Sequence, residues 1–329
     1  MLETFATKND NIEIDELTKE TAADKELESF FDKEAEILAS YGMKGDITIQ
    51  KGEVPGHTWA FDYTHQKLIY DPKFFTERGY TLKEALFATT HELMAHYGEF
   101  LREPELMLKE WHEDRGRLRS RPHLRLLHNI FEDVLGNRRI VAELPFLEET
   151  KTTLYKEKQF PKTDYRDNAL HVQFVYGFIR EAMVPEEDAQ VDEKIRQIYE
   201  KLRNFGKDKI DILDLVTTPT IDTKDRLRIM KNIVEPIYMD LYEKDVEEEK
   251  KSGKSGKPKK SGEGEEKNKQ EFSSAGKKGS NDRAIREAIE KKFKEQYKDY
   301  EKTHPEPLSV KDEENLKKAI EEIGGRKGG

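Results

Sequence analysis

The chain has 329 residues, of which 35% are hydrophobic and 38% charged, with a formal net charge of −10. It contains no cysteine, which excludes disulfide scaffolds, cysteine-ligated zinc ribbons, iron–sulfur clusters and thiol nucleophiles. The acidic balance disfavours nucleic-acid binding, because neutralising phosphates needs a basic surface. No segment has the ~18–20 apolar residues of a membrane span, and the first residues lack the basic and apolar runs of a secretory signal. We therefore expect a cytoplasmic protein with neither nucleic-acid nor membrane partners.

Apolar residues recur at regular spacing only before about residue 247, which divides the chain. We expect a flexible N-terminus over residues 1–22 and a single folded domain over residues 23–247. Residues 248–281 are rich in Lys, Gly, Ser and Glu, which is typical of a charged, flexible linker. Residues 282–329 carry two highly charged helical patterns. They form either a small appended module or a tail of helices that order only on a protein partner.

Taken in chain order, the periodicities indicate an α+β fold that is mainly α. Apolar residues at helical spacing predict a helix from Asp24 to Tyr41. A short strand follows over 46–51, and two β-rich runs around Thr64-His65-Gln66 predict a hairpin over 58–70. Thr81 and Glu84 fit a capping box, which starts a helix that extends to about Phe100. Further helices are expected at 122–142, 147–158, 167–183, 187–204 and 222–247.

The capped helix carries His91-Glu92-Leu93-Met94-Ala95-His96, a pattern suited to zinc-dependent hydrolysis. Such a site needs imidazoles that converge on the metal and a carboxylate that takes a proton from water. In a regular helix, residues five apart lie about 140° apart around the axis, too far for His91 and His96 to share an ion. A π-bulge would bring both onto one face. In the alternative, Glu92 and His96, four apart, are the ligand pair.

A third protein ligand is expected from the helix that follows. Glu132 lies between the apolar residues Phe131 and Leu135, so it is held toward the interior, where a metal would offset the cost of burying its charge. Asp133 is suited to holding a ligating imidazole through its second nitrogen. His128, four residues before Glu132 on the same face, is a reserve ligand or a donor to the transition state.

Several of these patterns resemble known zinc peptidases. The six-residue motif resembles that of the dipeptidyl peptidase III family, and Trp59 to His96 looks like the strand-and-helix unit of zincins. In zincins the strand before the motif helix is an edge strand to which the peptide substrate adds, a role that falls on residues 67–71. In gluzincin-type peptidases a Glu from a following helix completes the site, as Glu132 would here.

A second resemblance covers about residues 55–245. These residues look like the peptidase-like region that precedes von Willebrand factor A domains in cobaltochelatase-subunit-like proteins. There, a His/Glu helix is followed by an Asn-x-x-Glu-Asp helix with Arg shortly after, which Asn129 to Asp133 with Arg138 and Arg139 match. The chain departs from that pattern in its five-residue histidine spacing and in having no Asp-x-Ser-x-Ser motif.

We therefore expect a zinc peptidase that hydrolyses peptide or protein substrates. Zn²⁺ would be bound by His91, His96 and Glu132, and Glu92 would be the general base. An oxyanion donor is expected among four residues, namely Tyr97, Tyr155, His171 and Tyr176. Two alternatives stay open, a non-catalytic zinc-stabilised scaffold that binds a partner and a redox-metal protein that uses Glu92 and His96.

Overall fold

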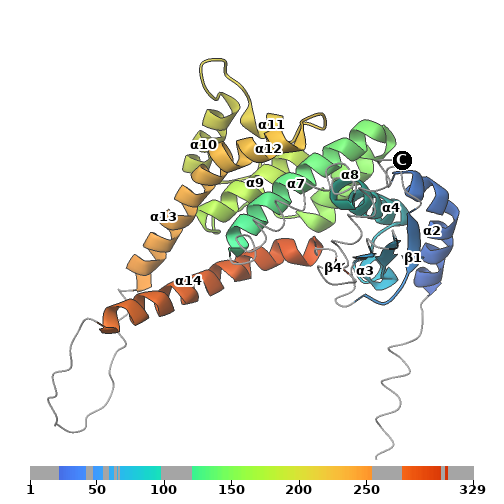
Figure 1. The fold of residues 1–329 in the computed structure, drawn as a ribbon, viewed down its shortest axis with the longest axis horizontal. Coiled ribbons are helices and arrows are strands. Elements are labelled where there is room, and N and C mark those ends of the chain that lie inside the picture. Colours follow the sequence, from blue (N-terminus) through green and yellow to red (C-terminus); the bar gives the residue numbers. More distant parts are fainter. Residues whose placement is uncertain are drawn as a thin grey trace, which may run out of the picture. The chain divides into compact units, whose positions relative to one another are not determined.

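The computed structural model describes residues 22–41, 47–54, 59–62, 65, 67–97, 121–253, 276–304 and 308–309. The chain divides into two compact units. Unit 1 comprises residues 1–93 and 306–329, and unit 2 comprises residues 94–305. Figure 1 shows the helices and strands of both units. As predicted, the fold is mainly helical with a small sheet.

Unit 1 contains the sheet and the first part of the motif helix. Its strands are β1 (Thr48–Lys51), β2 (Trp59–Asp62), β3 (Lys67–Tyr70) and β4 (Leu308–Ser309). Its helices are α2 (Ala22–Tyr41), α3 (Pro72–Thr76) and α4 (Leu82–His91), and α4 continues into the π-helix η1 (Glu92–Tyr97). The helix expected from Asp24, the hairpin and the capped helix are thus confirmed. The predicted end of the motif helix, near Phe100, lies outside the described residues.

The sheet has the order β1-β3-β2-β4. The predicted hairpin forms by antiparallel pairing of β2 with β3, while β1 pairs with β3 in parallel. Strand β3 is therefore an inner strand, and the expectation that residues 67–71 form a free edge for substrate is wrong. The reason is a long-range pairing that alternation within one strand cannot reveal: Ile49 of β1 lies opposite Leu68 of β3.

Aromatic side chains fill the core of unit 1. Phe31 of α2 meets the ring of Tyr70 edge-on, with centroids 4.6 Å apart. Trp59 of β2 lies 4.3 Å from the ring of Phe74. Asp71 begins α3 by accepting a hydrogen bond from the backbone of Lys73. These contacts join the sheet to the helices that precede and follow it.

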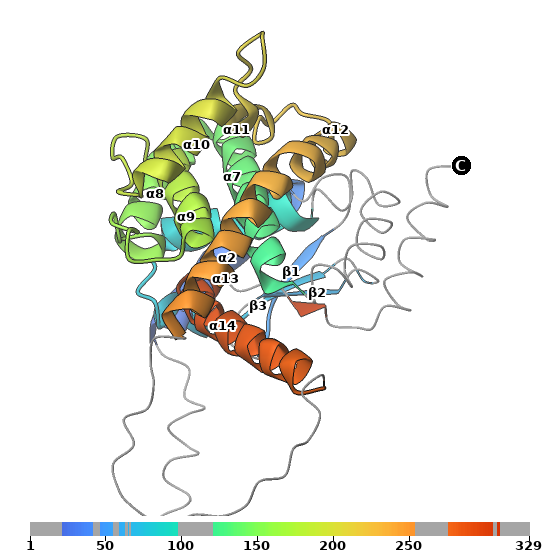
Figure 2. The ribbon, with the colours of Figure 1, turned by 90° about the vertical axis from the view of Figure 1, so that its left-hand side faces the viewer.

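Unit 2 is built around three helices, α7 (Pro122–Glu143), α9 (Leu170–Met183) and α13 (Glu235–Gly253). The shorter elements are η2 (Pro145–Leu147), α8 (Glu148–Leu154), η3 (Tyr155–Gln159), α10 (Glu193–Arg203), α11 (Ile212–Leu215), α12 (Thr223–Ile229) and η4 (Met230–Val234). Phe131 of α7 stacks on Phe178 of α9 at 4.4 Å in the centre of this core. Figure 2 shows α13 running beside α7 and α9.

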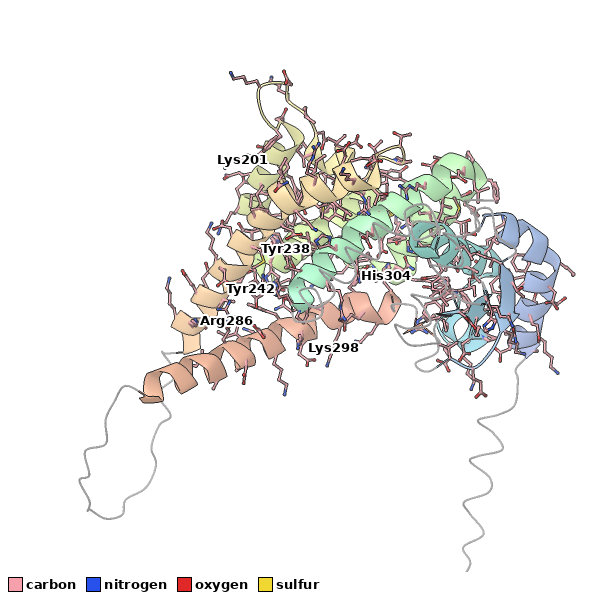
Figure 3. All side chains as sticks on the ribbon, in the orientation of Figure 1. Lys201, Tyr238, Tyr242, Arg286, Lys298 and His304 are labelled. Atoms are coloured by element: carbon pink, nitrogen blue, oxygen red, sulfur yellow. The ribbon has the colours of Figure 1, made fainter. Side chains whose placement is uncertain are left out.

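Helix α14 (Gly276–Thr303) belongs to the core of unit 2, although its sequence is highly charged. Ile289, Phe293, Tyr297 and Tyr300 recur every three or four positions and are buried, which gives the helix one apolar face. It packs against α13 and α7 (Figures 1 and 2). On the outside, Arg286 pairs with Glu243 of α13 at 2.8 Å (Figure 3).

The expectation of a loose charged tail therefore needs correcting over this helix. The prediction of a helix there is confirmed, but its aromatic face is covered by unit 2 itself rather than by a separate partner. The second charged pattern, within residues 310–329, and most of the predicted linker lie outside the described residues.

Candidate metal and substrate site

The motif helix begins with the predicted capping box. The Thr81 side chain accepts a hydrogen bond from the backbone N–H of Glu84, and the Glu84 carboxylate accepts one from the backbone N–H of Thr81 at 2.7 Å. This reciprocal pair fixes the start of α4. Along α4, Ala85, Phe87 and Ala88 are buried, so the helix that presents the motif is anchored in unit 1.

The turn that carries the motif is widened. Residues 92–97 form a π-helix, whose hydrogen bonds join positions five apart rather than four. Position 91 directly precedes this turn and position 96 lies within it. The five-residue separation of the histidines therefore equals the hydrogen-bond spacing of the turn. The backbone thus confirms the predicted bulge. His91 and Glu92 are both buried, at 8% and 5% exposure, whereas the His96 side chain is outside the described residues.

Glu132, the predicted third ligand, lies on α7 and is half-buried. Its carboxylate is 3.6 Å from Nη1 of Arg226 on α12, a side chain that is 1% exposed. A carboxylate beside a buried guanidinium offsets part of the cost of taking that cation out of water. Sequence reasoning missed Arg226, because 94 positions separate the two residues.

Asp133 and His128, on the same helix, have partners from other elements. Asp133 is buried and accepts a hydrogen bond from the hydroxyl of Tyr300 on α14. Nε2 of His128 lies 2.8 Å from Oε1 of Glu235, and both side chains are 8% exposed. His128 thus lies one turn before Glu132 with its imidazole fixed by a carboxylate.

A widened turn also positions Glu235. The π-helix η4 ends at Val234, directly before Glu235 and Pro236. Proline has no backbone N–H and disrupts regular helical hydrogen bonding, so a local change of helical repeat is expected there. Glu235 then starts α13 with its side chain against His128.

The two units divide the predicted residues. His91 and Glu92 belong to unit 1, whereas His96 and Glu132 belong to unit 2. Among the side chains that the structure describes, which exclude that of His96, no three His, Asp or Glu residues gather as a metal-binding group. The donors proposed from sequence are nevertheless the neutral imidazoles and carboxylate that zinc accepts.

Three of the four expected oxyanion donors lie in the core of unit 2. The Tyr155 hydroxyl accepts a hydrogen bond from Asn137 at 2.7 Å, and the Tyr176 hydroxyl donates to the backbone oxygen of Gln296 at 2.7 Å. His171 is fully buried. These contacts give all three a structural role. The side chain of the fourth, Tyr97, is outside the described residues.

Burial lowers the pKa of two histidines in this core, His123 and His171. His123 stacks on Tyr242 with centroids 3.8 Å apart, and burial lowers the pKa of His123 to about 3. Burial likewise lowers the pKa of His171, opposed by its hydrogen bond to Asp245. Both imidazoles are therefore neutral near pH 7, and both join α13 to a neighbouring helix.

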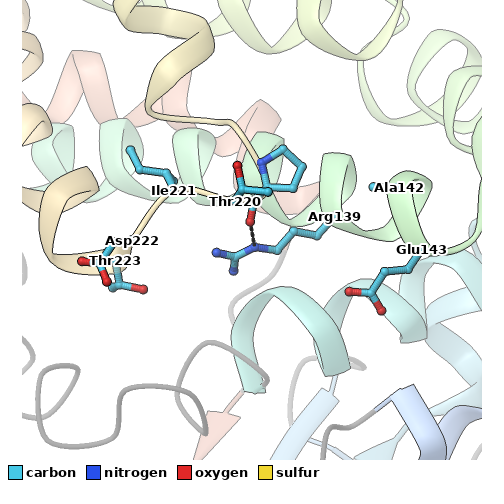
Figure 4. A pocket seen from close by; sticks show the side chains of 8 residues that line it. Arg139, Ala142, Glu143, Thr220, Ile221, Asp222 and Thr223 are labelled. Atoms are coloured by element: carbon cyan, nitrogen blue, oxygen red, sulfur yellow. Dashed lines mark hydrogen bonds between the residues drawn. The ribbon is translucent and has the colours of Figure 1, made fainter.

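A cavity of about 390 Å³ opens beside the end of α7, within the usual range for small-ligand sites. Its lining includes Arg139, Ala142 and Glu143 of α7 and residues 219–223 (Figure 4). Nε of Arg139 donates to the backbone oxygen of Pro219 at 3.3 Å. Arg139 is 6% exposed, so a buried cation forms part of the wall.

Comparisons with protein-family models, with curated proteins and with solved structures found no match. Among the described helices, none combines the length and apolar character needed to cross a membrane.

Proposed function

We propose that the chain is a zinc-dependent peptidase with His91, His96 and Glu132 as ligands and Glu92 as general base. The observation that carries this proposal is the π-helical turn over residues 92–97, whose hydrogen bonds join positions five apart, the separation of the two histidines. Such turns are rare and are frequent at functional sites. The donor set of two imidazoles and one carboxylate also suits a hydrolytic zinc site.

When bound, zinc would polarise the scissile carbonyl and lower the pKa of water. Glu92 directly follows His91 and is buried at 5% exposure, which supports its role as the base. It would take a proton from the attacking water and return it to the leaving amine. His128 lies one turn before Glu132 with its Nε2 against the Glu235 carboxylate. A hydrogen bond from His128 to the developing oxyanion would therefore come from Nδ1–H.

Metal content and peptide cleavage, measured on the same preparations, test this function. Wild type, Glu92→Gln and the control Glu77→Gln, which alters an exposed carboxylate of unit 1, are assayed on casein and a peptide library. We expect equal zinc in all three and cleavage by wild type and Glu77→Gln only. Zinc without cleavage in wild type would favour the non-catalytic scaffold, and cleavage by Glu92→Gln would exclude this base.

The ligand role of Glu132 is separable from its contact with Arg226. We expect Glu132→Ala to lower zinc affinity at least about tenfold, because it removes one of three ligands. Arg226→Lys, which keeps the charge facing Glu132, should retain zinc. Both variants are dialysed against a zinc buffer and analysed for metal and thermal stability. A lower melting temperature of Glu132→Ala with unchanged zinc affinity would mean that Glu132 is an ion-pair partner of Arg226 and not a zinc ligand.

The proposed substrates are peptides or proteins in the cytoplasm. The absence of cysteine fits a reducing compartment without requiring one. Because the face of α14 is occupied within unit 2, we do not assign that helix to a protein partner.

A further inference from the structure

Unit 2 exposes a few large apolar side chains at two separate places. Within the described residues these side chains are Phe146, Phe205 and Ile210. Phe205 and Ile210 lie in the loop between α10 and α11, whereas Phe146 lies in η2, between α7 and α8. A single exposed apolar residue is ordinary on a protein surface, so its surroundings decide whether it marks a binding site.

The loop over residues 205–210, which we name the basic tip, is a closed hairpin turn. Phe205 and Ile210 exchange two backbone hydrogen bonds, of 2.9 and 3.0 Å. Residues paired in this way lie directly opposite each other with their side chains on the same face, so the two apolar groups form one surface. Figures 1 and 2 show the loop projecting beyond the ends of α10 and α11.

The basic tip has a net positive charge on a chain that is acidic as a whole. Its charged residues are Lys207, Asp208 and Lys209, all of which are exposed. In the part of the chain that the structure describes, none of these three side chains forms an ion pair. The two ammonium groups are therefore available to carboxylates of another molecule.

The backbone holds the basic tip in one shape. Gly206 and Lys209 have positive φ, of 70° and 50°, and a lysine in this region is uncommon and is found most often at functional sites. Leu202 of α10 and Ile212 of α11, which flank the loop, are buried. A loop that is already ordered loses less conformational entropy on binding than a flexible one, so the tip is suited to contact a partner.

Residues 143–149, which we name the acidic patch, surround the ring of Phe146, which is 68% exposed. Leu144 and Leu147, three positions apart across this 3₁₀ turn, are both buried, which directs the residue between them outward. Three carboxylates are exposed beside the ring, those of Glu143, Glu148 and Glu149. None of the three forms an ion pair with a residue that the structure describes.

Helix geometry alone explains only part of the acidic patch. Glu148 and Glu149 occupy the first turn of α8, where the helix dipole favours acidic residues. Glu143 is the last residue of α7, where the same dipole disfavours them. The dipole also gives no reason for leaving the ring of Phe146 in water. Together, Glu143 and Phe146 indicate a surface suited to a partner that is both basic and apolar.

We infer that the basic tip of one copy of the chain binds the acidic patch of a second copy. The two surfaces are opposite in charge, and each presents apolar side chains. Every copy carries both, and among the described residues no ion pair joins them within one chain. A contact between different surfaces of identical chains is heterologous, so the copies associate head to tail. This inference does not depend on the proposed peptidase function.

Sedimentation velocity of the full chain measures the association. We examine concentrations from about 1 μM to about 0.5 mM, because so small a contact is expected to be weak and transient. The weight-average sedimentation coefficient of wild type should rise with concentration. A coefficient that does not rise overturns the inference.

Variants of each surface locate the contact. Phe205→Gln/Lys207→Gln disables the tip, and Phe146→Gln/Glu149→Gln disables the patch. Each should raise the dissociation constant at least about tenfold, because it removes an aromatic anchor and a charge from the interface. All four side chains are exposed, so the melting temperature should stay unchanged. Association like that of wild type in either variant overturns the inference.

A control variant separates this contact from a general effect of charge. Lys251→Gln/Lys294→Gln removes two exposed charges from α13 and α14, away from both surfaces in sequence. It should associate like wild type. A loss of association equal to that of the tip variant would mean that overall charge, rather than the basic tip, controls self-association, which contradicts the inference.

A mixture of the two disabled variants tests whether the tip and the patch are partners. Each variant alone lacks one surface, but the patch variant keeps an intact tip and the tip variant keeps an intact patch. We expect the equimolar mixture to form heterodimers and nothing larger, because a single intact contact remains. A mixture that stays monomeric, while wild type associates, would mean that the copies meet through other surfaces.

Discussion

The imidazole of His171 and the hydroxyl of Tyr297 lie 2.8 Å apart, across 126 positions of the chain. On its other side, Nδ1 of His171 is 2.6 Å from the carboxylate of Asp245. Because that carboxylate accepts, Nδ1 carries the proton, and Nε2 accepts from Tyr297. This chain of polar groups joins α9, α13 and α14 inside an apolar core.

Tyr297→Phe should loosen α14 without unfolding unit 2. The change leaves the buried Nε2 of His171 without its donor, at a cost of about 1–3 kcal/mol. We expect a lower free energy of unfolding in urea and faster hydrogen exchange in α14 than in α9. As a control, Lys298→Gln alters the neighbouring exposed position and should change neither. Equal exchange in wild type and Tyr297→Phe would mean that this hydrogen bond does not hold the helix.

Acid should destabilise the protein through His123. Its pKa is about 3 in the folded chain, lowered by burial from the ordinary value of 6.5. Between these values the unfolded state binds one proton more than the folded state, so stability falls as the pH falls. The loss from this group is about 2 kcal/mol between pH 7 and pH 5, at about 1.4 kcal/mol per pH unit below 6.5.

His123→Phe tests this linkage, because phenylalanine keeps a ring against Tyr242 and removes the titration. Urea unfolding at pH 7 and at pH 5 should show a smaller difference in the variant than in wild type. The remaining difference includes the contribution of His171, whose pKa is also lowered by burial. Identical pH dependence in the two proteins would show that His123 is not protonated preferentially on unfolding.

Gly177→Ala should destabilise unit 2, although alanine is the better helix former. A Cβ at position 177 would lie 2.8 Å from both the Tyr199 hydroxyl and Val191 Cγ1. Tyr199 is held by its hydrogen bond to the backbone oxygen of Phe174 at 2.5 Å. The clash, about 1–3 kcal/mol, outweighs a gain in helix propensity of up to about 1 kcal/mol.

A double-mutant cycle identifies the clash as the cause. Tyr199→Phe removes the hydroxyl that the new methyl group meets, so Gly177→Ala should be less destabilising in that background. Thermal unfolding of the four proteins gives the coupling. Additive effects would place the strain at Val191, which precedes α10, or within α9 itself.

Much of the fold near the motif follows from residues close together in the sequence. The capping box at Thr81 and Glu84, the hairpin and the helical periodicities depend on neighbours at most a few positions apart, which a pattern can display. The spacing of His91 and His96 likewise required a widened turn for a shared face, and that turn is present. The position of the His96 side chain does not follow from the spacing.

Other features depend on partners far away in the chain. The inner position of β3 depends on its pairing with β1 and β2, and strand alternation is the same in edge and inner strands. The sequence of α14 resembles a charged tail because few of its residues are apolar. Those residues become buried only because α14 packs against α7 and α13.

The sequence alone therefore determined the local elements and the residue types of the candidate site, because capping, turn chemistry and helical repeat act over short separations. Tertiary structure decided which side chains contact the residues of the candidate site. His128 faces Glu235 across 107 positions, and Glu132 faces the buried Arg226. Such pairs form because charged groups taken out of water require partners, and their identity depends on how the helices pack rather than on any pattern within one of them.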